Sequence, residues 1–204
     1  MKKKLMILGA GGYGRVIAEC AELSGQYSEF VFLDDVEPTE QLSYPYYGKL
    51  DKVYDYVDEY DIAIAIGDGR IREFWITELE KKGANLPNII HPNATVSPGA
   101  KLGIGTVVMP GAVINTGTLI GKGVIVNTAS SIDHDCIVGD YCHVAVGAHL
   151  CGTVILDTHI WVGAGSIVIQ NIRVCKDCIL GAGTVIVKDI DVAGTYVGVP
   201  GVRK

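Results

Sequence analysis

The stretch that decides the fold is Asn127–Asp140, NTASSIDHDCIVGD, in which an aliphatic residue at Ile132 returns six residues later at Val138. Followed in both directions, this six-residue step meets an aliphatic side chain at eighteen consecutive positions. They are Ile90, Val96, Leu102, Val108, Ile114, Ile120, Val126, Ile132, Val138, Val144, Leu150, Leu156, Val162, Val168, Val174, Leu180, Ile186 and Val192. Chance does not hold one register for so long, so the sequence predicts a hexapeptide repeat from about Ile90 to Val192.

A repeat of six fits a short strand plus a turn, with one aliphatic side chain per unit facing a common core. The residue four positions later is usually small enough for the chain to bend around a corner. Examples are Thr106, Ala112, Ser130, Cys136, Cys142, Ala148, Ser166 and Cys178. Glycines that follow the aliphatic residue recur at intervals of eighteen and, once, twenty-four, and the interval of eighteen indicates three units per coil. We therefore expect a triangular prism of about six coils, roughly 30 Å tall at about 4.8 Å per coil. A β-sandwich is the alternative, but it does not keep one register over so many units.

The first ninety residues follow a different pattern, in which strands alternate with helices. The apolar run Lys4–Ala10 leads into glycines at 9, 11 and 14, which fit the GxGxxG spacing, and a helix is predicted over Arg15–Leu23. A second strand over Phe30–Leu33 precedes a third over Asp61–Ile66, and a second helix is predicted over Ile71–Lys82. The pattern predicts a small doubly wound β/α domain over 1–88 and a repeat domain over 89–204.

The glycine loop indicates a nucleotide site. Glycines let a backbone approach a phosphate, and a helix N-terminus favours the negative charge. Asp34 and Asp35 end the second strand, at the distance where a carboxylate is expected to bind a ribose. Ninety residues form only about one mononucleotide-binding half, so a nucleotide-linked substrate fits better than a dinucleotide cofactor. The alternative is that the glycines serve only a tight turn.

The composition narrows the class of protein. With 49% hydrophobic and 20% charged residues, the chain can bury a core, and a net charge of -6 argues against a nucleic-acid partner. No signal peptide or transmembrane stretch follows the opening lysines, so we expect a cytoplasmic protein with no membrane partner. Disulfides are not expected. Cys175 and Cys178 have CxxC spacing, but Cys178 falls on a small-residue position, which favours packing over redox or zinc chemistry.

Four of the five histidines offer little chemistry at this stage. His91 precedes a proline at the domain junction and is interpreted as structural, and His159 as part of a solvent-facing edge. His143 and His149 are six residues apart, so they are expected on consecutive faces of the prism. A shared metal would need a subunit boundary between them, and we expect no metal site.

His134 is the candidate general base. It is flanked by Asp133 and Asp135, and imidazole titrates near neutrality, where it can accept a proton from an attacking nucleophile. A neighbouring carboxylate could orient the ring and stabilise its cation. A solvated turn is the alternative interpretation of these three residues.

Four motifs in this order resemble the sugar O/N-acetyltransferases of the bacterial sialic acid and UDP-amino-sugar pathways. They are the glycine loop Gly9–Gly14, the run Phe32-Leu33-Asp34-Asp35, the stretch Asn127–Asp140 and the ending Val197-Gly198-Val199-Pro200. The resemblance covers nearly the whole chain. It implies a fold of α/β plus all-β class, with a small Rossmann-like N-terminal domain followed by a left-handed parallel β-helix, and it implies a homotrimer. The handedness runs against the usual right-handed crossover rule.

The resemblance also implies roles for single residues. His134 matches the general base, and Asp135 the acid that raises its basicity. Acetyl-CoA is the implied co-substrate, with no permanently bound cofactor, and it is implied to contact His143 and the backbone at Gly152, Ala164 and Ala182. The positions implied for the nucleotide-sugar pocket and active site are Gly11, Gly12, Tyr13, Asp34, Asp35, Gly67 and Asn127. Tyr13 and Asp135 depart from the family, which often has histidine and glutamate there.

The resemblance, together with the candidate base and the nucleotide loop, implies an acetyl-CoA-dependent N-acetyltransferase acting on the amine of a UDP-linked 4-amino-4,6-dideoxy sugar. His134 would take the proton, and a backbone N–H such as that of Gly152 would face the oxyanion. The alternatives are O-acetylation of sialic acid or a related nonulosonate, a non-catalytic nucleotide-sugar-binding scaffold, and a zinc hydratase.

Overall fold

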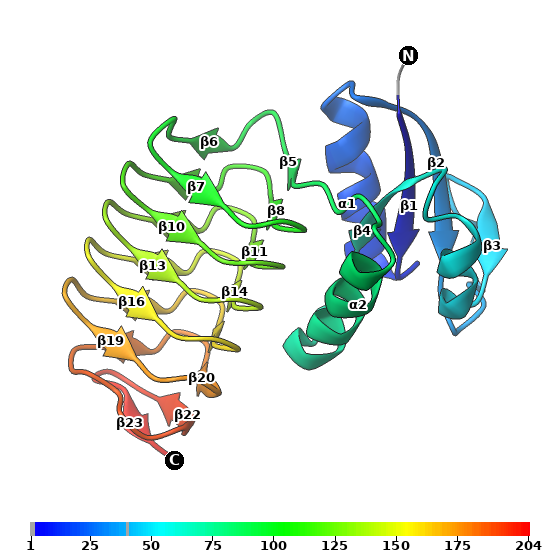
Figure 1. Cartoon of the computed structure of the whole chain (residues 1–204). Helices are drawn as coiled ribbons and strands as arrows, with labels where there is room; N and C mark the ends of the chain where they lie inside the picture. The colour runs from blue at the N-terminus through cyan, green and yellow to red at the C-terminus, as the bar shows by residue number, and fades with distance from the viewer. Residues whose placement is uncertain (1–2, 40) are drawn as a thin grey trace. The chain divides into compact units, whose positions relative to one another are not determined.

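The computed structural model in Figure 1 describes residues 3–39 and 41–204. The chain divides into two compact units, Met1–Pro92 and Asn93–Lys204, so the division falls a few residues beyond the expected boundary at 88. No helix among the described residues is long and apolar enough to cross a membrane.

The first unit is a Rossmann-like α/β domain built on a four-stranded parallel sheet of order β3-β2-β1-β4. The strands are β1 (Lys3–Leu8), β2 (Tyr27–Leu33), β3 (Tyr46–Gly48) and β4 (Asp61–Ile64). The helices are α1 (Gly12–Leu23), α2 (Gly69–Lys81) and the 3-10 helix η1 (Leu50–Asp55). β1 is apolar throughout Leu5–Leu8 because a parallel strand is covered on both faces, and these four side chains are fully buried.

The main elements of this unit were predicted, but several ends differ. The first helix begins at Gly12 instead of Arg15, because packing at the glycine loop overrides the poor helix propensity of glycine. β2 starts at Tyr27, three residues before the expected Phe30, and β4 ends at Ile64 instead of Ile66. β3 and η1 were not predicted from the sequence.

The second unit is a left-handed parallel β-helix with three faces, as the resemblance implied. Face 1 contains β8 (Val107–Val108), β11 (Ile125–Val126), β14 (His143–Val144), β17 (Trp161–Val162) and β20 (Cys178–Leu180). Face 2 contains β6 (Thr95–Val96), β9 (Val113–Ile114), β12 (Ser131–Ile132), β15 (His149–Leu150), β18 (Ile167–Val168) and β21 (Val185–Ile186). Face 3 contains β7 (Lys101–Leu102), β10 (Leu119–Ile120), β13 (Ile137–Val138), β16 (Ile155–Leu156) and β19 (Arg173–Val174), which Figure 1 shows as one column.

Three short strands lie at the ends of this array. β5 (Ile89–Ile90) precedes the first coil, β22 (Gly194–Val197) pairs with β20, and β23 (Val202–Arg203) runs antiparallel to β22. Within the coils, residues eighteen apart are paired, as Leu119 is with Ile137. This pairing confirms three hexapeptide units per coil.

The repeated aliphatic residues form the core. From Val108 to Ile186 every one of them is at most 5% exposed, and burial of each such side chain contributes roughly 1.5–3 kcal/mol. The prediction was wrong at both ends of the series. Ile89 is buried in place of Ile90, and Val192 is 53% exposed, because Ile190 takes the inward position and bridges to Val174.

The chain turns at three corners, between faces 1 and 2, faces 2 and 3, and faces 3 and 1. Every sixth residue from Gly105 to Gly183 has a left-handed backbone with φ between 54 and 73°. At the 1–2 corner four of these five positions are glycine. At the 2–3 corner the successive residues are Gly117, Asp135, Thr153 and Asn171, so three coils carry a polar side chain in this conformation.

Candidate active site

His134 and Asp135 form a hydrogen-bonded pair at the 2–3 corner, directly after β12. His134 Nδ1 lies 2.9 Å from Asp135 Oδ2, and both side chains are exposed. The hydrogen bond with the carboxylate raises the pKa of His134 above its ordinary value, and desolvation opposes this only in part. The contact occupies Nδ1, so the remaining ring nitrogen, Nε2, is the atom that can accept a proton.

A second pair of side chains fixes the turn that carries the imidazole. Asp133 Oδ1 accepts hydrogen bonds from the His134 backbone N–H, at 2.8 Å, and from Asn115 Nδ2 one coil earlier, at 2.9 Å. The Asn115 amide, followed by the His134 N–H, holds the pKa of Asp133 below its usual value. Asn115 was missed by the sequence analysis, although it lies eighteen residues before Asp133 and the coil length could have identified it.

Gly152 lies one coil below the imidazole and is in contact with it. A Cβ placed on Gly152 would lie 2.6 Å from His134 Nε2 and 2.7 Å from Cε1, closer than carbon and nitrogen atoms approach. The absence of a side chain at Gly152 therefore lets Nε2 lie against the backbone of the next coil. The expected general base, His134, therefore lies beside Gly152, one of the positions expected to bind acetyl-CoA.

The other expected β-helix positions lie elsewhere on the same chain. Asn127, Ala164 and Ala182 follow strands of face 1 at the 1–2 corner, and His143 projects from face 1. Asn127 Nδ2 lies 3.0 Å from His143 Nε2, so these two side chains meet each other. The structure therefore divides the expected residues between two corners and does not bring them together within one protomer.

Trp161 adds a feature that the sequence analysis missed. Its ring stacks on that of His143 with centroids 6.1 Å apart and planes 2° apart, and it is half exposed. The two residues are eighteen apart and paired in face 1, so the same coil spacing predicts their contact.

In the first unit the glycines separate into two kinds. A Cβ on Gly14 would lie 1.9 Å from the Gly9 carbonyl oxygen, and a Cβ on Gly9 would lie 2.6 Å from the Ala65 oxygen, so both are required by the turn itself. Nothing lies within 4 Å of a Cβ on Gly11 or Gly67. Open glycines at these strand ends leave room for a ligand near the backbone.

A pocket of about 210 Å³ opens beside this loop. It is lined by Ala10, Gly11, Arg15, Pro38, Thr39 and Leu42. Gly11 is the N-cap of α1, and no side chain caps the helix, so the first-turn N–H groups remain available to an anion. Gly12, the first helical residue, is exposed.

The two strand-end carboxylates have structural contacts. Asp34 Oδ2 accepts from the Ala10 N–H at 2.7 Å and Oδ1 from the Val36 N–H at 3.0 Å, while Asp35 Oδ1 accepts from the Leu50 N–H at 3.2 Å. Asp34 therefore ties the glycine loop to the end of β2. Asp35 is exposed, and each oxygen retains further acceptor capacity.

Tyr13 places a polar atom in a buried position. Its hydroxyl is buried with no hydrogen-bond partner among the described residues, and burial raises its pKa. The Arg72 guanidinium opposes that shift. Arg72 is itself buried and donates to the carbonyls of Ile66 and Gly67 at 2.9 Å each, which fixes the end of β4.

The remaining histidines and cysteines have packing contacts. His91 is buried, and His149 lies on a different face from His143, as expected. The solvent-facing interpretation of His159 was wrong, because its ring is half-buried and stacked on Tyr141 at 5.3 Å. Within residues 3–39 and 41–204, no group of three His, Cys, Asp or Glu residues is placed to hold a metal ion.

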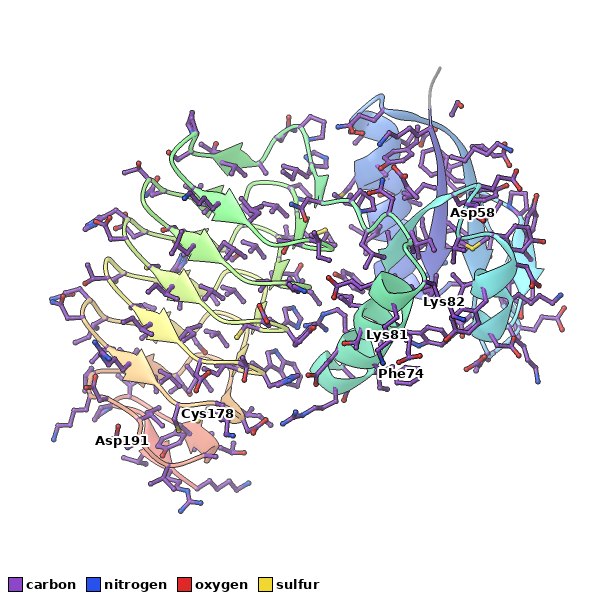
Figure 2. The ribbon with its side chains drawn as sticks, in the orientation of Figure 1. Asp58, Phe74, Lys81, Lys82, Cys178 and Asp191 are labelled. Carbon is purple, nitrogen blue, oxygen red and sulfur yellow. The ribbon has the colours of Figure 1, made fainter. Side chains whose placement is uncertain are left out.

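Cys178, labelled in Figure 2, occupies the buried small-residue position predicted for it. Its Sγ lies 3.7 Å from that of Cys175, and both thiols are free. Burial raises the pKa of Cys178 to about 12, which disfavours the reactive thiolate.

The fold is that of a hexapeptide-repeat protein, and comparison with solved structures identifies the class as acyltransferase. The acetyltransferase domain of PglB from Neisseria gonorrhoeae, in complex with acetyl coenzyme A, is 39% identical over the full length of both chains, with a TM-score of 0.96. The chain belongs to the family of hexapeptide-repeat sugar acetyltransferases, and it is an enzyme that transfers acyl groups.

Further comparisons agree with this assignment. A mutant GDP-perosamine N-acetyl transferase from Caulobacter crescentus, in complex with CoA and GDP-perosamine, is 32% identical with a TM-score of 0.91, covering 98% of this chain and 96% of that one. A GDP-perosamine N-acetyltransferase of Escherichia coli O157:H7 is 29% identical over 188 residues, covering 87% of this chain and 82% of that protein. Residues 4–79 match the PglD N-terminal domain.

Proposed function

We propose that this protein transfers the acetyl group of acetyl-CoA to the amine of a UDP-linked 4-amino-4,6-dideoxy sugar. The observation that carries the proposal is the His134–Asp135 pair, with Nδ1 held by the carboxylate and Nε2 resting against Gly152. Relatives that bind acetyl-CoA, or CoA with GDP-perosamine, support both substrate classes.

In the proposed reaction His134 Nε2 removes a proton as the amine nitrogen attacks the thioester carbonyl. A C–N bond forms, the C–S bond breaks, and the leaving thiolate receives the proton from the imidazolium. General base catalysis of this kind contributes about 10²–10⁴-fold. Asp135 supports the imidazolium, consistent with its effect on the pKa of His134.

The oxyanion that develops on the thioester carbonyl needs a hydrogen-bond donor close to His134 Nε2. The Gly152 backbone N–H is our candidate, because this residue already contacts Nε2. An oxyanion donor is worth about 3–4 kcal/mol in the transition state.

The divided arrangement of the β-helix positions supports a homotrimer. His134, Asp135 and Gly152 share the 2–3 corner, while Asn127, Ala164 and Ala182 share the 1–2 corner. In a three-fold assembly, the 2–3 corner of one protomer would lie against the 1–2 corner of its neighbour. We call each of these three interfaces a seam. Acetyl-CoA would then lie between protomers, with His143 of one protomer near the thioester that His134 of its neighbour serves.

Complementation between protomers tests this arrangement. His134→Ala disables one side of each seam, and Ala164→Trp is expected to block donor binding at the other. Each variant alone should be inactive, whereas mixed and refolded protein should recover activity at the seams that contain neither change. A mixture as inactive as its parents would contradict the shared site.

The first unit supports binding of the nucleotide. Gly11, Gly12 and Gly67 leave open backbone at the ends of β1 and β4, and Arg15 lines the adjacent pocket. A diphosphate at the start of α1 would gain the helix N–H groups and a guanidinium. We assign Asp35 to the ribose hydroxyls and the buried Tyr13 hydroxyl to a polar group of the ligand. The bonds already made by Asp34 suggest that it shapes the pocket.

A substrate panel tests the function. Purified protein is given acetyl-CoA with UDP-linked and GDP-linked amino sugars, their hydroxyl analogues, sialic acid and CMP-sialic acid, and free thiol is measured. The proposal predicts rapid CoA release with the UDP-linked amino sugar. Release only with GDP-linked sugars would correct the base, release with sialic acid would favour O-acetylation, and binding without release would indicate a scaffold.

A further inference from the structure

The 2–3 corner continues below the dyad as a column of polar residues in left-handed conformation. Thr153 has φ 61° and Asn171 has φ 63°, one and two coils below Asp135. Threonine is β-branched and is an outlier in this region, where glycine is favoured. At the 1–2 corner the chain uses glycine in the same coils, at Gly147, Gly165 and Gly183. The 3–1 corner also has non-glycine residues in this conformation, at Tyr141, His159 and Asp177, so the role of Thr153 and Asn171 must be argued from the contacts of their side chains.

The two side chains are joined to each other and to the site backbone. The Thr153 hydroxyl lies 2.6 Å from Asn171 Oδ1 and 2.6 Å from the Gly152 carbonyl oxygen. The Thr153 N–H donates to the His134 carbonyl at 2.9 Å, and the Asn171 N–H to the Gly152 carbonyl at 3.1 Å. The column is thus built directly onto the residues that carry the proposed chemistry.

This arrangement orients the amide of Asn171. The Thr153 hydroxyl has a single proton, and when it is donated to Asn171 Oδ1 the two N–H groups of Nδ2 remain available for an acceptor; Asn171 is exposed. A ligand with a carbonyl oxygen beside Asn171 could accept a hydrogen bond from Nδ2.

Acetyl-CoA, the proposed acyl donor, has two amide carbonyls at a suitable distance from its sulfur. In acetyl-CoA the two amide carbonyl carbons of the pantetheine arm follow the sulfur by about four and about eight bonds, or roughly 5 and 10 Å at about 1.2 Å per bond. Asn171 lies one coil below Gly152 and two below Asp135, which corresponds to roughly 5 to 10 Å at about 4.8 Å per coil.

We propose that Asn171, oriented by Thr153, donates a hydrogen bond from Nδ2 to an amide carbonyl of the pantetheine arm and so positions the acyl donor. Thr153 acts through Asn171 and is a positioning residue. The inference rests on the proposed use of acetyl-CoA, but it names residues that neither the dyad nor the oxyanion contact requires.

The test compares kinetic constants for the two substrates. Asn171→Gly keeps a residue suited to the left-handed backbone and removes the amide, so KM for acetyl-CoA should rise about three- to tenfold, as expected for one neutral hydrogen bond. The kcat and the KM for the sugar should stay within about twofold. Asn171→Asp presents acceptors to a carbonyl and should raise the donor KM further, and Thr153→Val should raise it less. Asp177→Gly, in the same backbone conformation at the 3–1 corner, is the matched control and should change neither KM.

Truncated donors and direct binding locate the contact. S-acetylpantetheine has both amides without the nucleotide, so Asn171→Gly should raise its KM by the same factor as for acetyl-CoA. Calorimetric titration of free CoA should show the same weakening without any acceptor sugar. A loss seen with acetyl-CoA alone, a loss shared equally by the sugar, or unchanged donor binding would overturn the proposal. Wild-type protein that binds CoA but acetylates no sugar would instead refute the proposed function.

Discussion

Gly152→Ala isolates the contact between the imidazole and the next coil. The new Cβ would lie 2.6 Å from His134 Nε2, whereas ordinary contact begins at 3.4 Å, so the ring must move away by about 0.8 Å. The backbone φ of Gly152 is not left-handed, so alanine adds no strain there. The atom that must move belongs to an exposed side chain, and the free energy of unfolding should change by about 1 kcal/mol or less.

Catalysis should be far more sensitive than stability. Misplacement of a reacting group by about 1 Å can cost about 10²-fold, so we expect kcat to fall by about that factor, or about 2.7 kcal/mol of activation free energy. The assay is initial-rate CoA release, with thermal unfolding measured in parallel.

A double-mutant cycle supplies the control for this prediction. In a His134→Ala background the imidazole is absent, so adding Gly152→Ala should cause little further loss. A Gly152→Ala enzyme with near-normal kcat, or a full additional loss in the double variant, would refute the idea that Gly152 acts by accommodating Nε2.

Three further changes test other parts of the account. His134→Ala should lower kcat by about 10²–10⁴-fold while CoA still binds by calorimetry, and near-normal turnover would remove the general base. Asp135→Asn replaces the carboxylate that raises the pKa of His134 with a neutral amide; because neutral imidazole is the active form, the acidic limb of the pH–rate profile should move to lower pH, and an unmoved limb would contradict this. Gly14→Ala would place its Cβ 1.9 Å from the Gly9 oxygen and should lower the free energy of unfolding by about 3 kcal/mol, whereas Gly11→Ala has open space and should weaken only nucleotide binding. Equal thermal stability of these two variants would contradict the distinction between Gly14, which the turn requires, and Gly11, which has open space around it.

The β-helix could be predicted because every six-residue unit has an aliphatic residue at the same position. Inward aliphatic residues repeat without interruption from Val108 to Ile186, most of the corner positions between them are small, and the structure buries all these aliphatic residues. The ends failed for a local reason. Past Ile186 the chain makes a shorter step, so Ile190 reaches the inward position that the six-residue rule gave to Val192.

The site was harder to predict because hydrogen bonds between coils depend on a spacing of eighteen as well as on residue type. The dyad joins adjacent residues, so His134 and Asp135 could be paired from the sequence. The contacts of Asn115 with Asp133, and of Thr153 with Asn171, each cross one coil. Once the coil length is known, reading the sequence at intervals of eighteen finds both.

The structural role of Asp34 could not be inferred from motif position alone. A carboxylate at the end of the second strand fits a ribose contact, yet the Asp34 oxygens hold the Ala10 and Val36 N–H groups. The distinction depends on how closely the glycine loop approaches β2, which the spacing of residues does not specify.

Chemical analysis of the product tests the central claim most directly. The enzyme is incubated with acetyl-CoA and a UDP-linked 4-amino-4,6-dideoxy sugar, and the isolated sugar is treated with hydroxylamine and examined by NMR. We expect one acetyl group on the 4-amino nitrogen, as an amide that resists hydroxylamine. An acetyl ester that hydroxylamine removes, or an unmodified amine after prolonged incubation with protein that binds both substrates, would contradict the account.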